Sequence, residues 1–341
     1  MSKSSSLIET TRNEDILVVE NLKVYHPIRK LFSVVGYVRA VDNVSFRIKR
    51  GEVVAIVGES GCGKTTLART IMKLVPITDG KIIFEGIDIS KLKGRTINKW
   101  YLRWVGFVQQ DPYGAMPPFM TIRSILEEPM KIHKVASDDR RKRVVEVLRE
   151  VGLTPPEDFL NKYPHMLSGG QLQRVAIARA LVLYPKLIVA DEPVSMLDAS
   201  VRIEILTLFR NLQKKYNSAT IYITHDFATA KYFSDRIAVM YAGQIVELGD
   251  SRDIINNPLH PYTQALIDVL PDPDPQNRFV FKKTLPGEPP NLMDPPPGCR
   301  LSPRCPHVFN KCKTIEPPMI EVKGRLVKCW LYEQQQTTRS Y

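Results

Sequence analysis

Long apolar runs are missing from this sequence. No part of its 341 residues approaches the ~18 uninterrupted apolar residues that a membrane-spanning helix needs. The opening stretch MSKSSSLIETTRNED is polar and lacks the apolar core of a secretory signal. Residues 1–15 have nothing to bury, so we expect them to form a flexible tail. The sequence therefore predicts a protein that stays in the cytoplasm.

Cysteine is scarce, and its few positions are uneven. The chain has 5 cysteines: Cys62 stands alone, and Cys299, Cys305, Cys312 and Cys329 lie near the end. In a cytoplasmic chain such a group indicates metal ligation before disulfides. The rest of the composition is ordinary, with 43% hydrophobic and 25% charged residues. These values predict a globular chain with room for a sizeable core and about two domains.

Negative charge is the minority, since 36 Asp and Glu stand against 48 Lys and Arg, which leaves a formal net charge of +12. Such an excess suits a polyanionic partner, an acidic membrane face or simply a soluble surface. Charge alone selects none of these partners.

Strand-like and helix-like stretches alternate along the chain. Short apolar, β-branched runs occur at residues 53–57, 186–193 and 219–226, and a helix-compatible stretch covers residues 64–74. This alternation predicts a mainly parallel sheet that is covered on both faces.

A helical insertion is predicted at about residues 112–178. One of its helices carries apolar residues at the spacing of an amphipathic helix, namely Val144, Val147, Leu148 and Val151. Farther along, 9 prolines in residues 271–297 preclude long helices and indicate a stiff, extended connector.

The stretch GESGCGKT at residues 58–65 matches the phosphate-loop pattern G-x-x-x-x-G-K-S/T, directly after a strand and before a helix. Its glycines let backbone N–H groups turn toward phosphates, Lys64 adds a point charge, and Thr65 offers a hydroxyl to Mg²⁺. A chance glycine-rich turn is the alternative, and the motifs below argue against it. The predicted nucleotide-binding residues are Gly58, Glu59, Ser60, Gly61, Cys62, Gly63, Lys64, Thr65 and Thr66. Cys62 is expected to contribute only its backbone N–H.

Two carboxylates end the second strand. Asp191 and Glu192 would lie at the carboxyl edge of the sheet, where ligands bind in such folds. Asp191 is predicted to hold Mg²⁺, and Glu192 to orient and polarise the attacking water. Helix N-capping is the alternative for an isolated pair of this kind.

Two further polar residues follow strands toward the same edge. His225 could hydrogen-bond the γ-phosphate, although a lone histidine is usually a surface or capping residue. Gln110 in VGFVQQDP could contact Mg²⁺ and the attacking water, and its register against Asp111 and Pro112 favours it over Gln109. The predicted catalytic residues are therefore Glu192, His225 and Gln110, and the predicted Mg²⁺ ligands are Thr65, Gln110 and Asp191.

Five motifs together carry a family resemblance. GESGCGKT, LSGGQLQR (167–174), LIVADE, SMLD (195–198) and THD around His225 resemble, in order and spacing, those of ABC transporter ATPase subunits. The resemblance covers residues 16–265. It implies an ABC-type P-loop NTPase fold of the α/β class: a mainly parallel sheet, an antiparallel β subdomain and the helical insertion. A proline-rich connector and a small cysteine-containing C-terminal extension would follow at residues 266–341.

The resemblance assigns the second glycine-bearing stretch to a partner molecule. In that family LSGGQ binds the ATP held by the opposite chain, and two subunits pack head to tail around two nucleotides. Ser168, Gly169, Gly170 and Gln171 precede a helix-compatible run whose N-terminus is a ready anion site. Simple helix capping by Ser168 is the alternative.

The resemblance also implies two finer assignments. The family stacks adenine on an aromatic ring before the first core strands, and Tyr25 in NLKVYHP matches, with Phe32 as the competitor. Asp198 resembles the family's turn that signals between the two sites, where Met196 departs from the more usual alanine.

The C-terminal part narrows the resemblance. HPYTQALIDVLPDPDP (260–275) and GCRLSPRCPHVFNKC (298–312) are similar to the extension of oligopeptide and dipeptide importer ATPases, and GYVRAVDNVSF and YPHMLSGGQ lean toward the F member of their D and F pair. The implied partners are a paralogous ATPase subunit, two transmembrane permease subunits and, indirectly, an extracytoplasmic solute-binding protein. The chain would lie on the cytoplasmic face of the membrane and dock a permease helix near Gln110 and residues 111–121. Some relatives import oligosaccharides, so the solute stays open.

Four cysteines separated by 5, 6 and 16 residues could hold a 4Fe-4S cluster, as in relatives of this subfamily, or a tetrahedral zinc ion. Free or oxidised thiols are the third possibility. Residues 298–313 carry Arg300, Arg304, Lys311 and Lys313 but no Asp or Glu. This charge favours the cluster, which carries net negative charge with four thiolates.

Two other functions fit part of the sequence. A soluble ABC ATPase that acts on nucleic acid or the ribosome would suit the charge of +12, but such proteins typically carry two cassettes or a coiled coil, and this chain has one cassette and no heptad run. A small-molecule kinase is contradicted by LSGGQ and by a hydrolytic Glu192. The sequence therefore predicts an importer ATPase that uses ATP and Mg²⁺, with no nucleic-acid partner.

Overall fold

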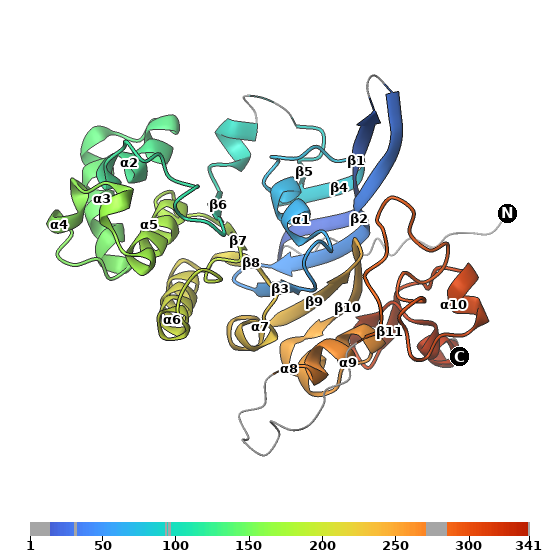
Figure 1. Cartoon of the computed structure of the whole chain (residues 1–341). Helices are drawn as coiled ribbons and strands as arrows, with labels where there is room; N and C mark the ends of the chain where they lie inside the picture. The colour runs from blue at the N-terminus through green and yellow to red at the C-terminus, as the bar shows by residue number, and fades with distance from the viewer. Residues whose placement is uncertain (1–13, 31–32, 93, 95–96, 271–284, 340–341) are drawn as a thin grey trace, which may run out of the picture.

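The structure, a computed structural model, describes residues 14–30, 33–92, 94, 97–270 and 285–339 (Figure 1). Most of the predicted tail, residues 271–284 of the predicted connector, and Phe32 lie outside the described residues. Within the described ranges, no helix combines the length and the apolar character needed to cross a membrane.

An eight-stranded sheet forms the centre of the fold. Its strands, in spatial order, are β11 (Ile320–Val322), β12 (Arg325–Val327), β10 (Gln244–Asp250), β9 (Arg236–Tyr241), β3 (Val53–Val57), β8 (Ala219–Thr224), β7 (Leu187–Asp191) and β6 (Val105–Val108). The five strands from β9 to β6 pair in parallel, and the other three are antiparallel to their neighbours. The predicted mainly parallel sheet is confirmed.

Both faces of this sheet are buried, as the apolar runs predicted. Alternate residues of β3 enter two different apolar clusters: Val53, Ala55 and Val57 face one, and Val54 and Ile56 face the other. Helix α1 (Lys64–Ile71) packs into the second cluster, while α6 (Ala199–Tyr216) and α7 (Phe227–Phe233) pack into the first. The parallel strand ends are thereby fixed between two layers.

A separate four-stranded antiparallel sheet lies beside the N-terminal end of α1 (Figure 1). Its spatial order is β2 (Ser33–Lys49), β1 (Asp15–Lys30), β4 (Asp79–Phe84) and β5 (Ile87–Asp88). Each pair is antiparallel, so the expected antiparallel β subdomain is confirmed. A short helical turn, Ile97–Tyr101, leads from this sheet toward β6.

The helices between β6 and β7 gather at the end of the molecule away from the antiparallel sheet (Figure 1). They are α2 (Ile122–Ile132), α3 (Ser137–Glu150), α4 (Glu157–Leu160), the turn Pro164–Met166, and α5 (Gly169–Leu181). The amphipathic spacing correctly predicted α3, since Val144, Val147 and Leu148 are all buried on one face.

The C-terminal residues continue the central sheet. After α8 (Ser251–Asn256), α9 (Pro261–Asp268) and α10 (Asn310–Thr314), the hairpin β11–β12 pairs with β10 through Glu247 and Leu248. A final helical stretch covers Trp330–Arg339. The extension is thus joined to the core by main-chain pairing, which its proline content did not predict.

Candidate functional site

A cleft of about 650 Å³ lies at the carboxyl ends of the parallel strands, where the two sheets meet. It is lined by residues from the phosphate loop, from three strand ends, from the antiparallel sheet and from the C-terminal part of the chain. These residues are His26, Val38, Ala40, Ser60, Gly61, Gly63, Lys64, Thr65, Thr66, Gln110, Glu192, His225 and Leu292. The predicted catalytic residues Gln110, Glu192 and His225 are therefore brought together beside the phosphate loop.

The phosphate loop connects β3 to α1 and needs its glycines. Gly61 and Gly63 have φ of 77° and 106°, in the left-handed region that side chains disfavour. A Cβ on Gly63 would lie 2.0 Å from the carbonyl oxygen of Ala40, and one on Gly58 would lie 2.1 Å from that of Met240. The loop can pack this closely on its neighbours only without side chains.

Lys64 is folded into the loop that it follows. Its Nζ donates hydrogen bonds to the carbonyl oxygens of Gly58 at 2.8 Å and Glu59 at 2.9 Å, and the residue is 5% exposed. The ammonium thus lies inside the curve of the loop, and α1 directs the positive end of its dipole to the same place. Both features favour a phosphate group in the cleft.

Thr65 and Asp191 form a pair of hard oxygen ligands. Thr65 Oγ1 donates to Asp191 Oδ1 at 3.3 Å. Burial raises the pKa of Asp191, and the adjacent Glu192 carboxylate adds to the effect. A buried carboxylate with this cost is suited to a cation, and Mg²⁺ commonly binds through one or two protein oxygens while substrate phosphates supply others. The residues present therefore fit a Mg²⁺ ion that arrives with a nucleotide.

Glu192 is held between two strand ends. Gln110 Nε2, after β6, donates to Glu192 Oε2 at 3.2 Å, and His225 Nδ1, after β8, lies 3.2 Å from Glu192 Oε1. Glu192 also has φ of 46°, a strained value that recurs at functional sites. Its carboxylate is thus held at the cleft by residues that follow the two neighbouring strands. This arrangement could orient a water toward a terminal phosphate.

Four predicted nucleotide-binding residues are not among those that line the cleft, namely Tyr25, Gly58, Glu59 and Cys62. Tyr25 does not line the cleft: its hydroxyl donates to Asp42 Oδ1 at 2.6 Å, and burial and this bond raise the pKa of Tyr25 to about 12. His26, the next residue, lines the cleft because successive strand residues face opposite sides. The Glu59 carboxylate pairs with Arg304, and Cys62 is buried, with its pKa raised by that burial. The sequence offered no signal for His26 beyond its place beside Tyr25.

The predicted signature residues do not line this cleft. Ser168 caps α5: its Oγ accepts from the Gln171 N–H at 3.3 Å, and its own N–H donates to Gln171 Oε1 at 3.1 Å. Gly169 and Gly170 form the first turn of the helix. Asp198 precedes α6 and is exposed. Capping by Ser168 is therefore real, and the residues at the α5 N-terminus are not among those that line the chain's own nucleotide cleft.

The four C-terminal cysteines come together. All four line one small cavity with His260 and His307, and none forms a disulfide. Burial raises the pKa of Cys299 to about 11 and that of Cys329 to about 12, so thiolates there need a compensating positive charge. Among the described residues, no three His, Cys, Asp or Glu side chains are arranged to hold a single metal ion.

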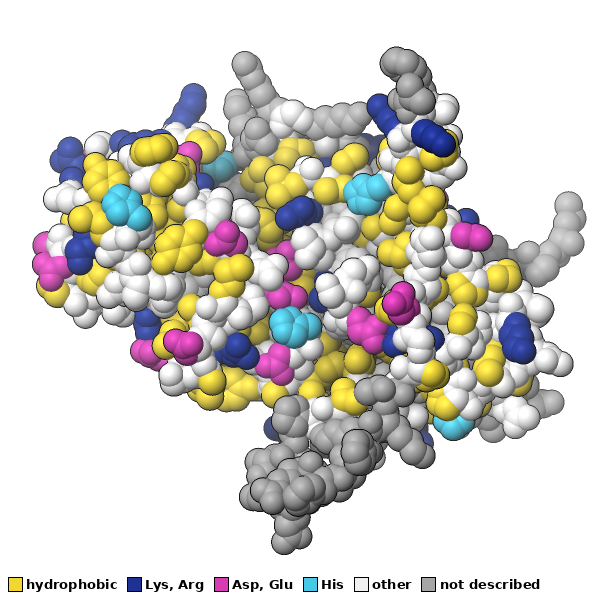
Figure 2. All heavy atoms as spheres, in the orientation of Figure 1, with side chains coloured by type: hydrophobic (Ala, Val, Ile, Leu, Met, Phe, Trp, Pro, Cys, Tyr) yellow, Lys and Arg dark blue, Asp and Glu magenta, His cyan; other side chains and the backbone are white. Residues whose placement is uncertain are grey.

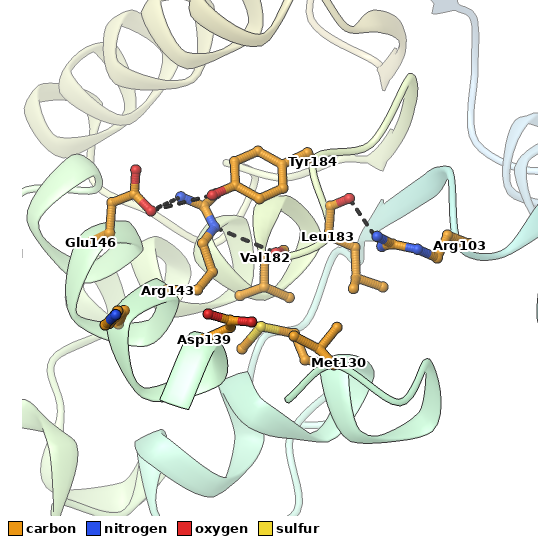
Figure 3. Close-up of a pocket in the computed structure, with 10 residues that line it drawn as sticks. Arg103, Met130, Asp139, Arg143, Glu146, Val182, Leu183 and Tyr184 are labelled. Carbon is orange, nitrogen blue, oxygen red and sulfur yellow. Dashed lines mark hydrogen bonds and ion pairs between the residues drawn. The ribbon is translucent and has the colours of Figure 1, made fainter. Parts of the chain in front are cut away.

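A further pocket lies between α2, α3 and the end of α5, and Arg143 dominates it (Figure 3). The guanidinium stacks 4.0 Å from the Tyr184 ring and donates to the carbonyl oxygen of Leu181 at 3.0 Å. It also pairs with Glu146 and Glu150. The Arg143 guanidinium thus has its partners within the chain, and these contacts join the helices.

Comparison with known families agrees with this arrangement. Residues 41–195 match the family described as ABC transporter, and residues 246–312 match the oligopeptide/dipeptide transporter C-terminal region.

Two curated relatives cover nearly the whole chain. The chain is 43% identical over 324 residues to the oligopeptide transport ATP-binding protein AppF of Bacillus subtilis, covering 94% of this chain and 98% of that protein. It is 39% identical over 330 residues to the dipeptide transport ATP-binding protein DppF of Escherichia coli, covering 96% and 98%.

Solved structures share the fold. The dimeric ATP-binding cassette MJ0796, in a post-hydrolysis state bound to ADP and Pi, is similar at a TM-score of 0.62 with 31% identity, covering 69% of this chain and 99% of that one. CbiO1 of Clostridium perfringens, part of the transporter complex CbiONQ, is similar at 0.62 with 30% identity, covering 72% and 92%.

Proposed function

The chain belongs to the family of ABC transporter ATP-binding proteins of the oligopeptide/dipeptide type, and on this premise we propose that it binds and hydrolyses ATP to drive the import of peptides. The peptide solute rests on the C-terminal match and on the names of the curated relatives. No observation favours an oligosaccharide over a peptide as the transported solute. Residues 16–265 would form the nucleotide-binding domain, and residues 266–341 the connector and extension.

The cleft residues divide the work of hydrolysis. The loop N–H groups and Lys64 would neutralise the β- and γ-phosphates. Thr65, Asp191 and Gln110 would hold Mg²⁺, which stabilises charge on the phosphate oxygens when bound. Glu192 would accept a proton from the attacking water, and His225 would hydrogen-bond the γ-phosphate.

The observation that carries this assignment is Glu192, fixed between Gln110 and His225 at 3.2 Å from each, at the rim of the phosphate loop. Glu192→Gln should lower the rate of phosphate release by about 10²- to 10⁴-fold, the usual contribution of a general base. ATP binding should persist, because Lys64 and the loop are untouched. Glu204→Gln, the same change at an exposed ion pair with Arg174, is the matched control. Undiminished hydrolysis by Glu192→Gln would place the base elsewhere.

We also propose that Ser168, Gly169, Gly170 and Gln171 complete the site of a partner subunit. Two observations support this: none of these residues lines the chain's own cleft, and a similar cassette is a dimer bound to ADP and Pi. The partner would be a paralogous subunit in a heterodimer, with Asp198 at the contact between sites. A Glu192→Gln chain with ATP should elute as a dimer with that paralogue, and Ser168→Tyr should abolish the dimer without weakening ATP binding to the isolated chain.

A helix of one of the two permease subunits would dock near Gln110 and residues 111–121, at the cytoplasmic face of the membrane. Phe119 is 90% exposed there and Tyr113 is 51% exposed, close after the catalytic Gln110. A large exposed aromatic beside the site is suited to a partner surface. Phe119→Ser should reduce recovery of the permeases in a pull-down of the assembled complex, whereas Leu74→Ser, at a residue that is 62% exposed, should not. The extracytoplasmic solute-binding protein would contact the permeases only.

The four cysteines would hold a 4Fe-4S cluster. A zinc ion needs four cysteine sulfurs at about 2.3 Å from one point. In a 4Fe-4S cluster, each of the four cysteine sulfurs would instead bind a different iron. The four cysteines line one cavity, and this proximity supports a group that is bound by four thiolates. The positive charge of residues 298–313 suits its negative charge, although the Arg300 and Arg304 guanidiniums pair with Asp42 and Glu59. Anaerobically purified protein should contain iron and show a visible absorption band that bleaches on reduction. Zinc without iron would overturn the assignment.

A further inference from the structure

Glu59 of the phosphate loop is held by two residues from the far end of the chain. Its backbone N–H donates to the Tyr262 hydroxyl oxygen at 2.9 Å. Its Oε2 lies 3.2 Å from Arg304 Nη1, and its Oε1 lies 3.5 Å from Nη2. Backbone and side chain of one loop residue are therefore both directed away from the cleft and toward the C-terminal part of the chain.

The two residues that hold Glu59 are themselves fixed. Tyr262, at the start of α9, is fully buried, and its ring centroid lies 4.5 Å from that of Tyr241. The Tyr241 hydroxyl accepts from Arg304 Nη1 at 3.4 Å, and Arg304 Nε donates to the Pro286 carbonyl oxygen at 3.1 Å. The Arg304 side chain is only 8% exposed. A hydrogen bond from such a fixed group costs little side-chain entropy to make.

The C-terminal segment (residues 285–339), which contains Arg304, also forms part of the cleft wall. Leu292 lines the cleft, and its carbonyl oxygen accepts from the Arg39 N–H at 3.0 Å. Arg300 donates to the Ala242 carbonyl oxygen and to Asp42, below the loop. The C-terminal segment therefore contacts the nucleotide site at several points, and the contact at Glu59 reaches the phosphate loop directly.

We propose that Tyr262 and Arg304 are positioning residues for ATP, which hold the phosphate loop in its binding form through Glu59. This inference rests on the proposed function and adds a role for the C-terminal segment in it. A loop whose turns depend on glycines has many alternative conformations, and fixing one of its residues removes part of the ordering cost that ATP binding otherwise carries. Neither residue touches the reacting atoms, so the effect falls on affinity and leaves the chemistry unchanged.

The first test is Tyr262→Phe in the full-length chain, which removes one hydroxyl and keeps the buried ring. The Kd for Mg-ATP should rise about three- to tenfold, the loss expected for one buried hydrogen bond. KM for ATP should rise with it, while kcat changes less than about twofold, the pattern of lost ground-state binding. Tyr332→Phe is the matched control, because its hydroxyl donates to the Leu259 carbonyl oxygen at 2.8 Å in the same part of the chain.

The second test separates anchoring from a general loss of stability. Arg304→Gln and Glu59→Gln should each weaken ATP binding, and the double variant should be no weaker than Arg304→Gln alone, because both break one contact. Arg304→Lys, which keeps the charge, should recover part of the affinity. Additive losses would show that Glu59 meets the nucleotide itself and would overturn the proposal, as would a Tyr262→Phe chain with unchanged Kd. If the unmodified chain failed to bind ATP, the proposed function would be at fault instead.

Discussion

The phosphate loop and the C-terminal segment (residues 285–339) touch each other, yet they are held by contacts of opposite range. Lys64 bonds to carbonyl oxygens only 5 and 6 residues away. Arg304 and Arg300, in the C-terminal segment, reach partners 245 and 258 residues away. The chemistry of the site is thus encoded in a few neighbouring residues, while the alignment of those residues depends on the far end of the chain.

The surface view shows how close the two regions are. The cleft opens in the middle of the face in Figure 2, and the C-terminal segment lies directly beside it. Breaking either region should therefore affect nucleotide binding, but by different routes. A change in the loop should act locally, and a change in the segment should act through its folding.

The largest effect is expected from Cys305→Ser, which disrupts the C-terminal segment, the region held by long-range contacts. If the four cysteines hold the proposed cluster, its binding contributes directly to folding, and its loss should destabilise the segment by on the order of several kcal/mol. Because Arg304 precedes Cys305, ATP binding should weaken as well. Iron content and calorimetric unfolding of the full chain provide the measurement. Cys62→Ser, at the cysteine outside the cavity, should keep the iron. Equal iron in both variants would contradict the prediction.

Gly63→Ala disrupts the phosphate loop, which is the region held by short-range contacts. The new Cβ would lie 2.0 Å from the Ala40 carbonyl oxygen at a φ of 106°, so the backbone must move, and the free energy of unfolding should fall by roughly 3–5 kcal/mol. ATP binding should be lost with it.

Gly61→Ala gives the matched comparison for the loop. It has a φ of 77° but nothing within 4 Å of its Cβ, so only the backbone conformation is strained, at about 1–2 kcal/mol. Chemical unfolding of the nucleotide-free chains measures both values. Equal losses at the two glycines would show that the close approach to Ala40 does not constrain the loop.

The same contrast explains what the sequence could predict. Lys64, Thr65, Asp191 and Glu192 were predictable because each motif is contiguous and its strand-loop-helix context can be recognised nearby. The parallel sheet followed from apolar runs, which need no partner to be identified. All of these signals are local.

The rest depended on pairings that no single stretch specifies. The hairpin β11–β12 joins the sheet because β10 offers a free edge, and that edge is not visible in the hairpin's own residues. Glu59 is a predicted nucleotide ligand, and its contacts with Arg304 and Tyr262 join residues that are 245 and 203 positions apart in the sequence. Tyr25 is the predicted adenine contact because of its aromatic character, whereas the strand phase brings its neighbour His26 into the cleft lining.

His26→Ala tests whether His26 or Tyr25 contacts the adenine base, and a smaller effect is expected from it. Stacking of a base on a ring is worth about 1–3 kcal/mol, so the Kd for ATP should rise roughly tenfold. Tyr25→Phe should instead lower the Tm, since it breaks the bond to Asp42, and should change ATP affinity less. Titration calorimetry and thermal unfolding of both variants separate the two roles. A larger loss of ATP affinity in Tyr25→Phe than in His26→Ala would support Tyr25 as the adenine contact.

The smallest effect is expected from Asp191→Asn, which removes a buried negative charge that costs free energy. Burial raises the pKa of Asp191, so between its ordinary and its raised pKa the folded chain binds more protons than the unfolded chain. Stability therefore falls as the pH rises through that window, and the full deficit is present above the raised pKa. Asparagine carries no charge, so the nucleotide-free variant should have a slightly higher Tm at neutral pH, with no difference below the ordinary carboxyl pKa. The gain in Tm that Mg²⁺ adds with ATP should shrink. A lower Tm at neutral pH would mean that the bond from Thr65 outweighs the cost of burial.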